Sequence, residues 1–213
     1  ILMSCLRDTV KREEEVKEKL DTHLIASVPH EKRPDGKNKK EKHSFLITHT
    51  VISFAFEESI RQIRTRLEYA AKQDGAKVFL ISSFGENEGK STISANSALS
   101  LAEKGYHVLL IDADFRKPAQ YKVLNRDVDE ANCLGEYLRG TCSVDKIIQT
   151  NAEVNLYEMF GKNYYSDSVE LLGSARMKKL LEVSRQKMDF IIIDSPPMSA
   201  LSDTEVLAEL VDA

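Results

Sequence analysis

The sequence predicts an α/β fold: a doubly wound, mostly parallel sheet with helices on both faces. Three apolar runs, residues 78–81, 107–111 and 190–193, contain almost no polar side chains, as expected of strands covered on both faces. Helix-forming sequence follows the first run and precedes the third. Each run ends in a polar stretch, and open α/β sheets bind ligands at the carboxyl ends of their strands. The three polar stretches therefore mark the expected site.

Composition places the chain among ordinary soluble globular proteins. Of its 213 residues, 42% are apolar and 30% are charged, which suits one α/β domain with a smaller appendage. The net charge of −4 gives no indication of nucleic-acid binding, and no nucleic-acid partner is expected. The three cysteines lack CxxC spacing, so reduced thiols are expected.

The first polar stretch, Phe84–Thr92, has the context of a phosphate-binding loop because it joins an apolar run to a helix that opens with Gly-Lys-Ser. Backbone N–H groups and the positive helix N-terminus surround phosphate oxygens in such loops. Lys90 is expected to reach the β- and γ-phosphates, and the Ser91 hydroxyl to ligate Mg²⁺. The residues expected to contact nucleotide are Gly85, Glu86, Asn87, Glu88, Gly89, Lys90, Ser91 and Thr92.

This loop departs from the usual pattern. Phe84 stands where glycine is usual, and Gly85 lies one place late. Asn87 is therefore expected to take any left-handed conformation, which asparagine tolerates better than most residues. A strand-to-helix turn that binds nothing is the alternative for this stretch alone. Lys90 is expected to be an exposed loop side chain with little part in stability.

The second polar stretch begins at the end of the strand expected over residues 107–112. Asp112 and Asp114 alternate along an extended chain, so both carboxylates can point the same way. They could hold Mg²⁺ or accept a proton from an incoming hydroxyl. The alternative is that Asp114 caps the next turn.

The third polar stretch starts with Asp194, after the apolar run 190–193. A buried strand that ends in aspartate is the Walker B arrangement, which holds Mg²⁺, although the same pattern is frequent in turns. Three such stretches in this order predict a fold of P-loop NTPase type that binds ATP and Mg²⁺.

A helix is expected over about residues 55–72. Its apolar positions follow helical spacing and would dock it on the core: Phe56, Ile60, Ile63 and Leu67. Charged residues recur every three positions and are expected to face outward: Glu58, Arg61 and Arg64. They fit intrahelical pairing and an intersubunit contact equally well.

The remaining elements are expected as a short strand over 23–29, short helices within 119–150, a strand over 154–159 and one helix over 168–187. Residues 31–42 are rich in lysine and fit a solvated loop or a basic strip near an anionic membrane. Two units follow: an N-terminal segment with a basic linker over residues 1–43, and a P-loop domain over 44–213. The chain lacks an initial Met and is expected to be a fragment with a truncated C-terminus.

These stretches resemble the cytoplasmic kinase region of the bacterial tyrosine kinases (BY-kinases) that control capsular and exopolysaccharide synthesis. Glu58-x-x-Arg61-x-x-Arg64 is similar to the oligomerisation motif of that family, and Gly89-Lys90-Ser91-Thr92 to its Walker A motif. The most specific match is to the Walker A′ motif, at Leu110–Pro118. Three further matches are Ile192–Pro197, similar to Walker B, Glu170–Ser174, and Val10–Pro29, which in the family follows a membrane helix.

The resemblance implies a protein-tyrosine kinase, with Lys90 and Ser91 on nucleotide and metal, and Asp114 and Asp194 on Mg²⁺. Asp112 would lie near the attacking tyrosine oxygen. Arg116, in the same motif, joins Lys90, Asp112 and Asp114 as a catalytic residue. The implied partners are tyrosine-containing proteins, a membrane chain-length-determinant module in cis or in trans, and further copies in a ring built through Glu58, Arg61 and Arg64. The implied location is the cytoplasmic face of the bacterial cell membrane.

Two departures and two alternatives remain. Glu86-Asn87 stands where the family usually has Pro-Gly, and the tyrosine-rich C-terminal tail is absent. One alternative is a ParA/MinD-type ATPase switch, although Gly85 stands where that class usually has a second lysine. The other is a non-catalytic nucleotide-binding adaptor, which the unusual loop suggests.

Overall fold

The computed structural model describes residues 15–16, 22–31, 45–48, 52–151 and 153–213. Its centre is a five-stranded sheet in the order β1-β5-β2-β4-β3. Neighbouring strands are parallel except β3, which runs antiparallel to β4 at one edge. The strands are β1 (Val78–Ile81), β2 (Val108–Asp112), β3 (Ile148–Asn151), β4 (Leu156–Met159) and β5 (Phe190–Asp194).

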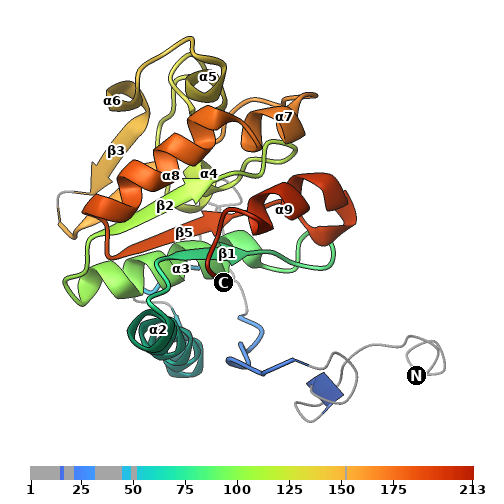
Figure 1. Cartoon of the computed structure of the whole chain (residues 1–213). Helices are drawn as coiled ribbons and strands as arrows, with labels where there is room; N and C mark the ends of the chain where they lie inside the picture. Colours follow the sequence, from blue (N-terminus) through green and yellow to red (C-terminus); the bar gives the residue numbers. More distant parts are fainter. Residues whose placement is uncertain (1–14, 17–21, 32–44, 49–51, 152) are drawn as a thin grey trace, which may run out of the picture.

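Helices cover both faces of this sheet, as the sequence predicts. In Figure 1, α3 lies on one face and α8 on the opposite face, while α2 packs on the outer side of α3. The helical elements are α2 (Phe54–Asp74), α3 (Lys90–Glu103), α4 (Gln120–Val123), α5 (Leu134–Arg139), α6 (Val144–Ile147), α7 (Ser168–Leu172), α8 (Ala175–Lys187), the 3-10 turn η2 (Met198–Ala200) and α9 (Leu201–Ala208).

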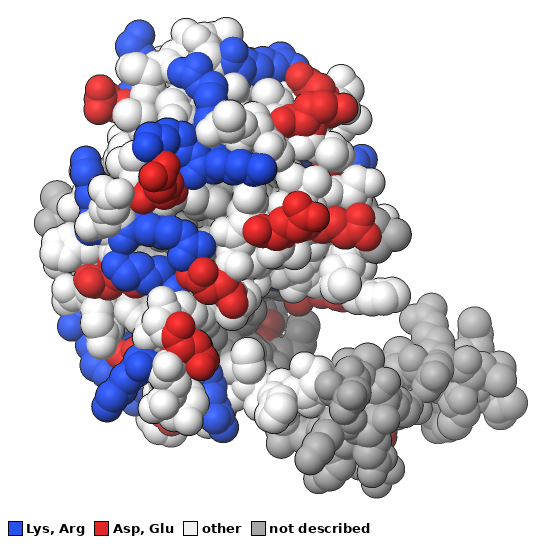
Figure 2. Space-filling model, viewed as in Figure 1, with Lys and Arg blue, Asp and Glu red and all other residues white. Residues whose placement is uncertain are grey.

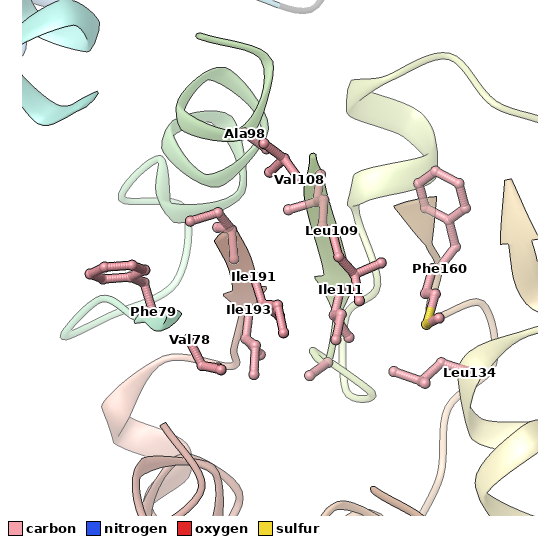
Figure 3. Close-up of a cluster of buried hydrophobic side chains, with 14 of the residues drawn as sticks. Val78, Phe79, Ala98, Val108, Leu109, Ile111, Leu134, Phe160, Ile191 and Ile193 are labelled. Atoms are coloured by element: carbon pink, nitrogen blue, oxygen red, sulfur yellow. The ribbon is translucent and has the colours of Figure 1, made fainter. Parts of the chain in front are cut away.

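The core is built from the apolar strands, of which β2 and β5 are buried along their whole length. Figure 3 shows Ile111 of β2 between Ile193 of β5 and Leu134, and Val108 near Ala98 of α3; all of these side chains are buried. Each fully buried Leu or Ile side chain contributes about 1.5–3 kcal/mol. This packing fixes the ends of β2 and β5, where the polar stretches begin.

Helix α2 docks as expected, except for one charged residue. Phe56, Ile60 and Leu67 are buried. Arg64 does not face outward with Glu58 and Arg61, because its Nη1 donates a hydrogen bond to Ser100 Oγ of α3 at 3.0 Å. Arg61 is exposed and pairs within the helix, at 2.6 Å from a Glu57 oxygen and 3.5 Å from one of Glu58.

Three expectations about secondary structure were wrong. The helix expected over 168–187 is two helices, because Ser174 Oγ accepts a hydrogen bond from Met177 N at 3.2 Å and caps the start of α8. Residues 23–29 form no strand in the described region, and Ile25 there is 51% exposed. Strand β3 was missed because Ile-Gln-Thr-Asn carries no alternating apolar pattern.

Most of the N-terminal segment with the basic linker, expected over 1–43, lies outside the described residues, including the basic stretch over 32–42. Within the described residues, no helix combines the length and apolar character needed to cross a membrane. Figure 2 shows acidic and basic side chains interspersed over the visible face.

The last residues of the chain are held along the outer edge of β1. Asp212 Oδ2 accepts hydrogen bonds from Lys77 N at 2.8 Å, Val78 N at 2.9 Å and Arg185 Nη1 at 2.6 Å. Leu80 N also donates to Ala213 O at 2.8 Å. Partial burial alone would raise the pKa of Asp212, but these three donors lower that pKa to about 2.

We predict that Asp212→Asn lowers the free energy of unfolding by about 1–2 kcal/mol at pH 7, because charge-assisted hydrogen bonds become neutral ones. The folded-state pKa lies below the ordinary value of 3.8, so this stabilisation is full above pH 3.8 and is lost as pH falls toward 2. Urea unfolding at several pH values measures it, with exposed Asp127→Asn as control. A difference that stays constant down to pH 2 would contradict the assignment.

Candidate functional site

The loop between β1 and α3 has the backbone of a phosphate-binding turn. Gly89 precedes the first residue of α3 and has φ of +93°, a conformation in which an L side chain is strained. Asn87 has φ of +61°, which confirms the prediction that it takes the left-handed conformation. Lys90 and Ser91 are therefore the first residues of a 14-residue helix whose N-terminus faces the loop.

Phe84 stands where the usual loop has glycine, and two side chains of the loop form hydrogen bonds with its backbone. Glu88 Oε2 accepts a hydrogen bond from Phe84 N at 3.0 Å, and Ser83 Oγ donates to Gly85 O at 2.6 Å. The Phe84 ring projects outward and is 82% exposed. The Glu88 carboxylate thus joins the end of the loop to Phe84, the residue at the first position of the usual pattern.

The structure brings the three polar stretches together at the carboxyl edge of the sheet. Strands β2 and β5 are neighbours, and Asp112 lies in register with Asp194. Lys90 Nζ is 2.9 Å from Asp114 Oδ2, and the two side chains are 12% and 2% exposed. Lys90 is therefore part of a buried ion pair, and the expectation of an exposed loop lysine was wrong. Burial would lower the pKa of Lys90, but Asp114, Asp194 and Asp112 together raise it above its ordinary value.

Asp194 is buried beside the start of α3. Burial raises the pKa of Asp194 to about 6, although hydrogen bonds from Ser91 and Gln120 and the charge of Lys90 oppose the rise. Ser94 Oγ also lies 3.3 Å from Asp194 Oδ1. The Ser91 hydroxyl lies close enough to this carboxylate to lower its pKa.

Asp112 is fully buried, and backbone groups surround it. Its Oδ2 accepts hydrogen bonds from Ala119 N at 3.1 Å and Gln120 N at 3.0 Å, and its Oδ1 accepts one from Asp114 N at 3.2 Å. Burial and the charge of Asp194 raise its pKa well above the ordinary value. In this conformation Asp112 anchors the start of α4.

Asp114 and Arg116 both face the site. Asp114 Oδ1 accepts a hydrogen bond from Lys117 N at 2.9 Å, so it also caps the turn, as the alternative for it proposed. The Arg116 side chain is half-exposed, and its Nε lies 2.6 Å from Oδ2 of the buried Asp203 at the start of α9. Arg116 is thereby fixed at the mouth of the site.

A cavity of about 560 Å³ opens between the loop and these side chains, a volume typical of small-molecule sites. Most of the predicted residues line it: Glu86, Asn87, Gly89, Lys90, Ser91, Thr92, Asp114 and Arg116. Four predicted residues are outside this lining: Gly85, Glu88, Asp112 and Asp194. The last two lie buried beneath the cavity, against the residues that form its wall.

The oxygen atoms at this site suit Mg²⁺. Ser91, Asp114 and Asp194 offer a hydroxyl and two carboxylates, and Mg²⁺ usually takes one or two carboxylates together with phosphate and water oxygens. Among the described residues, no group of three or more His, Cys, Asp or Glu side chains is placed to hold a metal ion alone. This donor set therefore fits a magnesium ion that is shared with a phosphate ligand.

Two contributors were missed from the sequence. Gln120 lies fully buried between Ser91 and Asp194, and Asp203 holds Arg116. Neither belongs to an apolar run or to a recognised motif, and both contacts join segments separated by more than 25 residues. No signal in the sequence identifies them.

Comparison with known proteins agrees with this geometry. A family model described as an AAA domain matches residues 76–209. The tyrosine-protein kinase CpsD of Streptococcus agalactiae is 34% identical over 157 residues, which cover 73% of this chain and 67% of that protein. The tyrosine-protein kinase ptk of Acinetobacter johnsonii is 30% identical over 98% of this chain but only 29% of its own length. The chain therefore spans under a third of that longer relative.

Solved structures share the fold. The kinase domain of the Escherichia coli tyrosine kinase ETK superposes with a TM-score of 0.80 at 26% identity, covering 95% of this chain and 80% of that chain. The septum site-determining protein MinD of Pyrococcus horikoshii, solved with Mg-ADP, gives a TM-score of 0.53 at 25% identity over 62% of this chain and 54% of that chain. MinD is thus a more distant fold relative.

We predict that Lys90→Met lowers the free energy of unfolding by about 3 kcal/mol, because it leaves the buried Asp114 carboxylate without its cation. Urea unfolding at pH 7 without nucleotide measures the loss. Lys179→Met on α8 is the matched control, since Lys179 pairs with Glu182 at an exposed position and such pairs contribute less than about 1 kcal/mol. Equal losses in the two variants would show that burial of the Lys90 pair does not matter.

Proposed function

Because this chain belongs to the family of bacterial tyrosine-protein kinases, we propose that it transfers the γ-phosphate of ATP to a tyrosine hydroxyl. The observation that carries the proposal is the Lys90–Asp114 ion pair, which lies at the phosphate loop beside Asp194. A cation and carboxylates at the end of a phosphate loop are what phosphoryl transfer requires, because its catalysis rests on positioning and charge.

In this proposal the loop N–H groups and the start of α3 bind the phosphates. Lys90 exchanges its contact with Asp114 for phosphate oxygens, which leaves Asp114 available as a ligand with Ser91 and Asp194. Mg²⁺ held by these three side chains would neutralise charge on the phosphates. Arg116, anchored by Asp203, stands at the cavity mouth where the phosphate acceptor enters.

Two hypotheses describe Asp112: it is either a proton acceptor or a structural anchor for α4. The family resemblance makes Asp112 the group near the attacking tyrosine oxygen, where it would accept a proton. Its three backbone hydrogen bonds support an anchoring role for α4 in the conformation described. A base role requires that at least one of these bonds opens when the acceptor binds.

We predict that two measurements, nucleotide binding and phosphotyrosine formation, distinguish the roles of Asp112, Asp114 and Asp194. Asp114→Asn and Asp194→Asn are expected to raise the Mg²⁺ concentration needed for nucleotide binding by about 10–100-fold, because the metal loses a charged ligand. Asp112→Asn is expected to leave this requirement near wild type and to slow phosphotyrosine formation by about 10²-fold or more if it is the base. The measurements are labelled-nucleotide binding and phosphotyrosine formation on a tyrosine-containing peptide.

Exposed Asp145→Asn is the control for these three variants. Equal loss of nucleotide binding in all three would place Asp112 with the metal ligands and contradict a base role. Phosphotyrosine formation by Asp194→Asn at wild-type rate would contradict the site itself.

Two other functions are tested by the same assay. ADP release without phosphotyrosine would favour a MinD-like ATPase switch, and nucleotide binding with neither product would favour an adaptor. Gly85, where the switch class usually has a second lysine, supports the kinase. The greater coverage and TM-score of the kinase-domain match support it too.

For partners, we propose that α2 contacts a second copy of the chain through Glu58 and Arg61, and that the protein acts at a membrane with a chain-length-determinant module. Arg61 is exposed, and its partners lie within its own helix, so it can exchange them for groups of a neighbour. Arg64 contributes differently, because it joins α2 to α3 inside one copy.

We predict that Arg61→Ala abolishes self-association and leaves the free energy of unfolding unchanged. Arg64→Ala is expected to lower the urea midpoint, because it removes the contact with Ser100 inside one copy. Light scattering over a range of concentrations measures the first effect, and urea unfolding the second. Self-association of Arg61→Ala equal to that of the wild type would reduce this residue to a surface ion pair.

A further inference from the structure

Gln120 touches all three polar stretches of the site although it belongs to none of them. Its Nε2 donates hydrogen bonds to Asp194 Oδ2 at 2.8 Å and to the carbonyl oxygen of Ser91 at 2.9 Å. Its backbone N–H donates to Asp112 Oδ2 at 3.0 Å. The side chain is fully buried, with no exposed surface.

The orientation of this amide is unambiguous. A carboxylate oxygen and a backbone carbonyl both accept hydrogen bonds, so only the NH₂ group can face Asp194 and Ser91. The amide oxygen, Oε1, therefore points away from these two groups. It is buried and has no hydrogen-bond partner among the residues that the structure describes.

This arrangement is unfavourable for a residue that only fills space. A buried acceptor without a partner costs free energy that an apolar side chain of similar length would avoid. The NH₂ group, in contrast, is fully used, and both of its acceptors belong to residues expected to ligate Mg²⁺. The hydrogen bonds of the Gln120 amide are thus made only to the expected metal-ligand residues Ser91 and Asp194 among the residues that the structure describes.

We propose that Gln120 is a positioning residue for magnesium binding, which rests on the proposed function. Its amide holds the Asp194 carboxylate and the first turn of α3, including Ser91, in one fixed arrangement. Its backbone bond to Asp112 fixes Gln120 itself. Two of the three expected metal ligands are thereby placed before the metal arrives, which is how groups behind the ligands strengthen metal sites.

Magnesium-dependent binding of mant-ADP, followed by fluorescence, tests this role. In Gln120→Met the side chain keeps its length and loses the NH₂ group. The Mg²⁺ concentration for half-maximal enhancement of mant-ADP binding is expected to rise about tenfold or more. Binding of mant-ADP in EDTA is expected to stay at the wild-type level, since the phosphate loop is unchanged.

The matched control is Gln149→Met. Gln149, on β3, also donates its amide to a backbone carbonyl, that of Asp127, but this hydrogen bond is exposed to solvent. Its magnesium requirement is expected to equal that of the wild type. Gln120→Glu serves as a second variant of the same shape, in which a carboxylate oxygen that cannot donate replaces the NH₂ group beside Asp194. Its magnesium requirement is expected to differ from that of the wild type.

Each outcome is decisive. A wild-type magnesium requirement in folded Gln120→Met and Gln120→Glu would reduce Gln120 to a packing residue. An equal loss of binding with and without Mg²⁺ would show that it supports the loop and not the metal ligands. Absence of any mant-ADP binding by the wild type would overturn the proposed function, and this inference with it, whereas a failure confined to the Gln120 variants leaves the proposed function intact.

Discussion

The site depends on how the protein stabilises three neighbouring carboxylates in a buried position. Asp112 and Asp194 are in register on adjacent strands, and Asp114 follows two residues later. Burial and mutual repulsion both disfavour the charged forms of Asp112 and Asp194. Three kinds of contact compensate for these charges. Asp112 accepts hydrogen bonds from backbone N–H groups, and Asp114 forms an ion pair with Lys90. Asp194 accepts hydrogen bonds from Ser91 and Gln120. Charge compensation therefore determines the position of the phosphate loop and of α4.

The apolar strands make this concentration of charge possible. Strands β2 and β5 are buried along their length, so neither can shift without exposing apolar side chains. Their fixed register holds Asp112 and Asp194 side by side at the sheet edge. Burial of apolar side chains in the core offsets the free energy of repulsion between these like charges, and those apolar residues take no part in the proposed reaction.

Features set by short stretches of chain were predictable from the sequence, and features set by distant contacts were not. Strands β1, β2, β4 and β5, the loop and the left-handed Asn87 follow from local patterns, as does the placement of Lys90 at the first turn of a helix, whereas β3 has no apolar pattern and was missed. Arg64 was misplaced because its partner Ser100 lies 36 residues away. The partners of Asp112 and the place of Gln120 depend on how the chain after β2 folds back over the strand ends, which periodicity does not describe.

The charge balance also explains why the loop can tolerate its own acidic residues. Glu86 pairs with Lys117 at 3.0 Å, and Glu88 accepts the Phe84 N–H, so both carboxylates already have partners within the site. Among the described residues, Lys90 is the cation paired with a carboxylate of this cluster, and its single charge cannot offset three aspartates. In the proposed function, a divalent cation would supply the missing positive charge, and phosphate would give Lys90 a new partner. Ligand binding would thus replace one set of charge-compensating contacts by another, and the buried aspartates, whose charges repel one another, are the groups that would favour a metal–phosphate ligand.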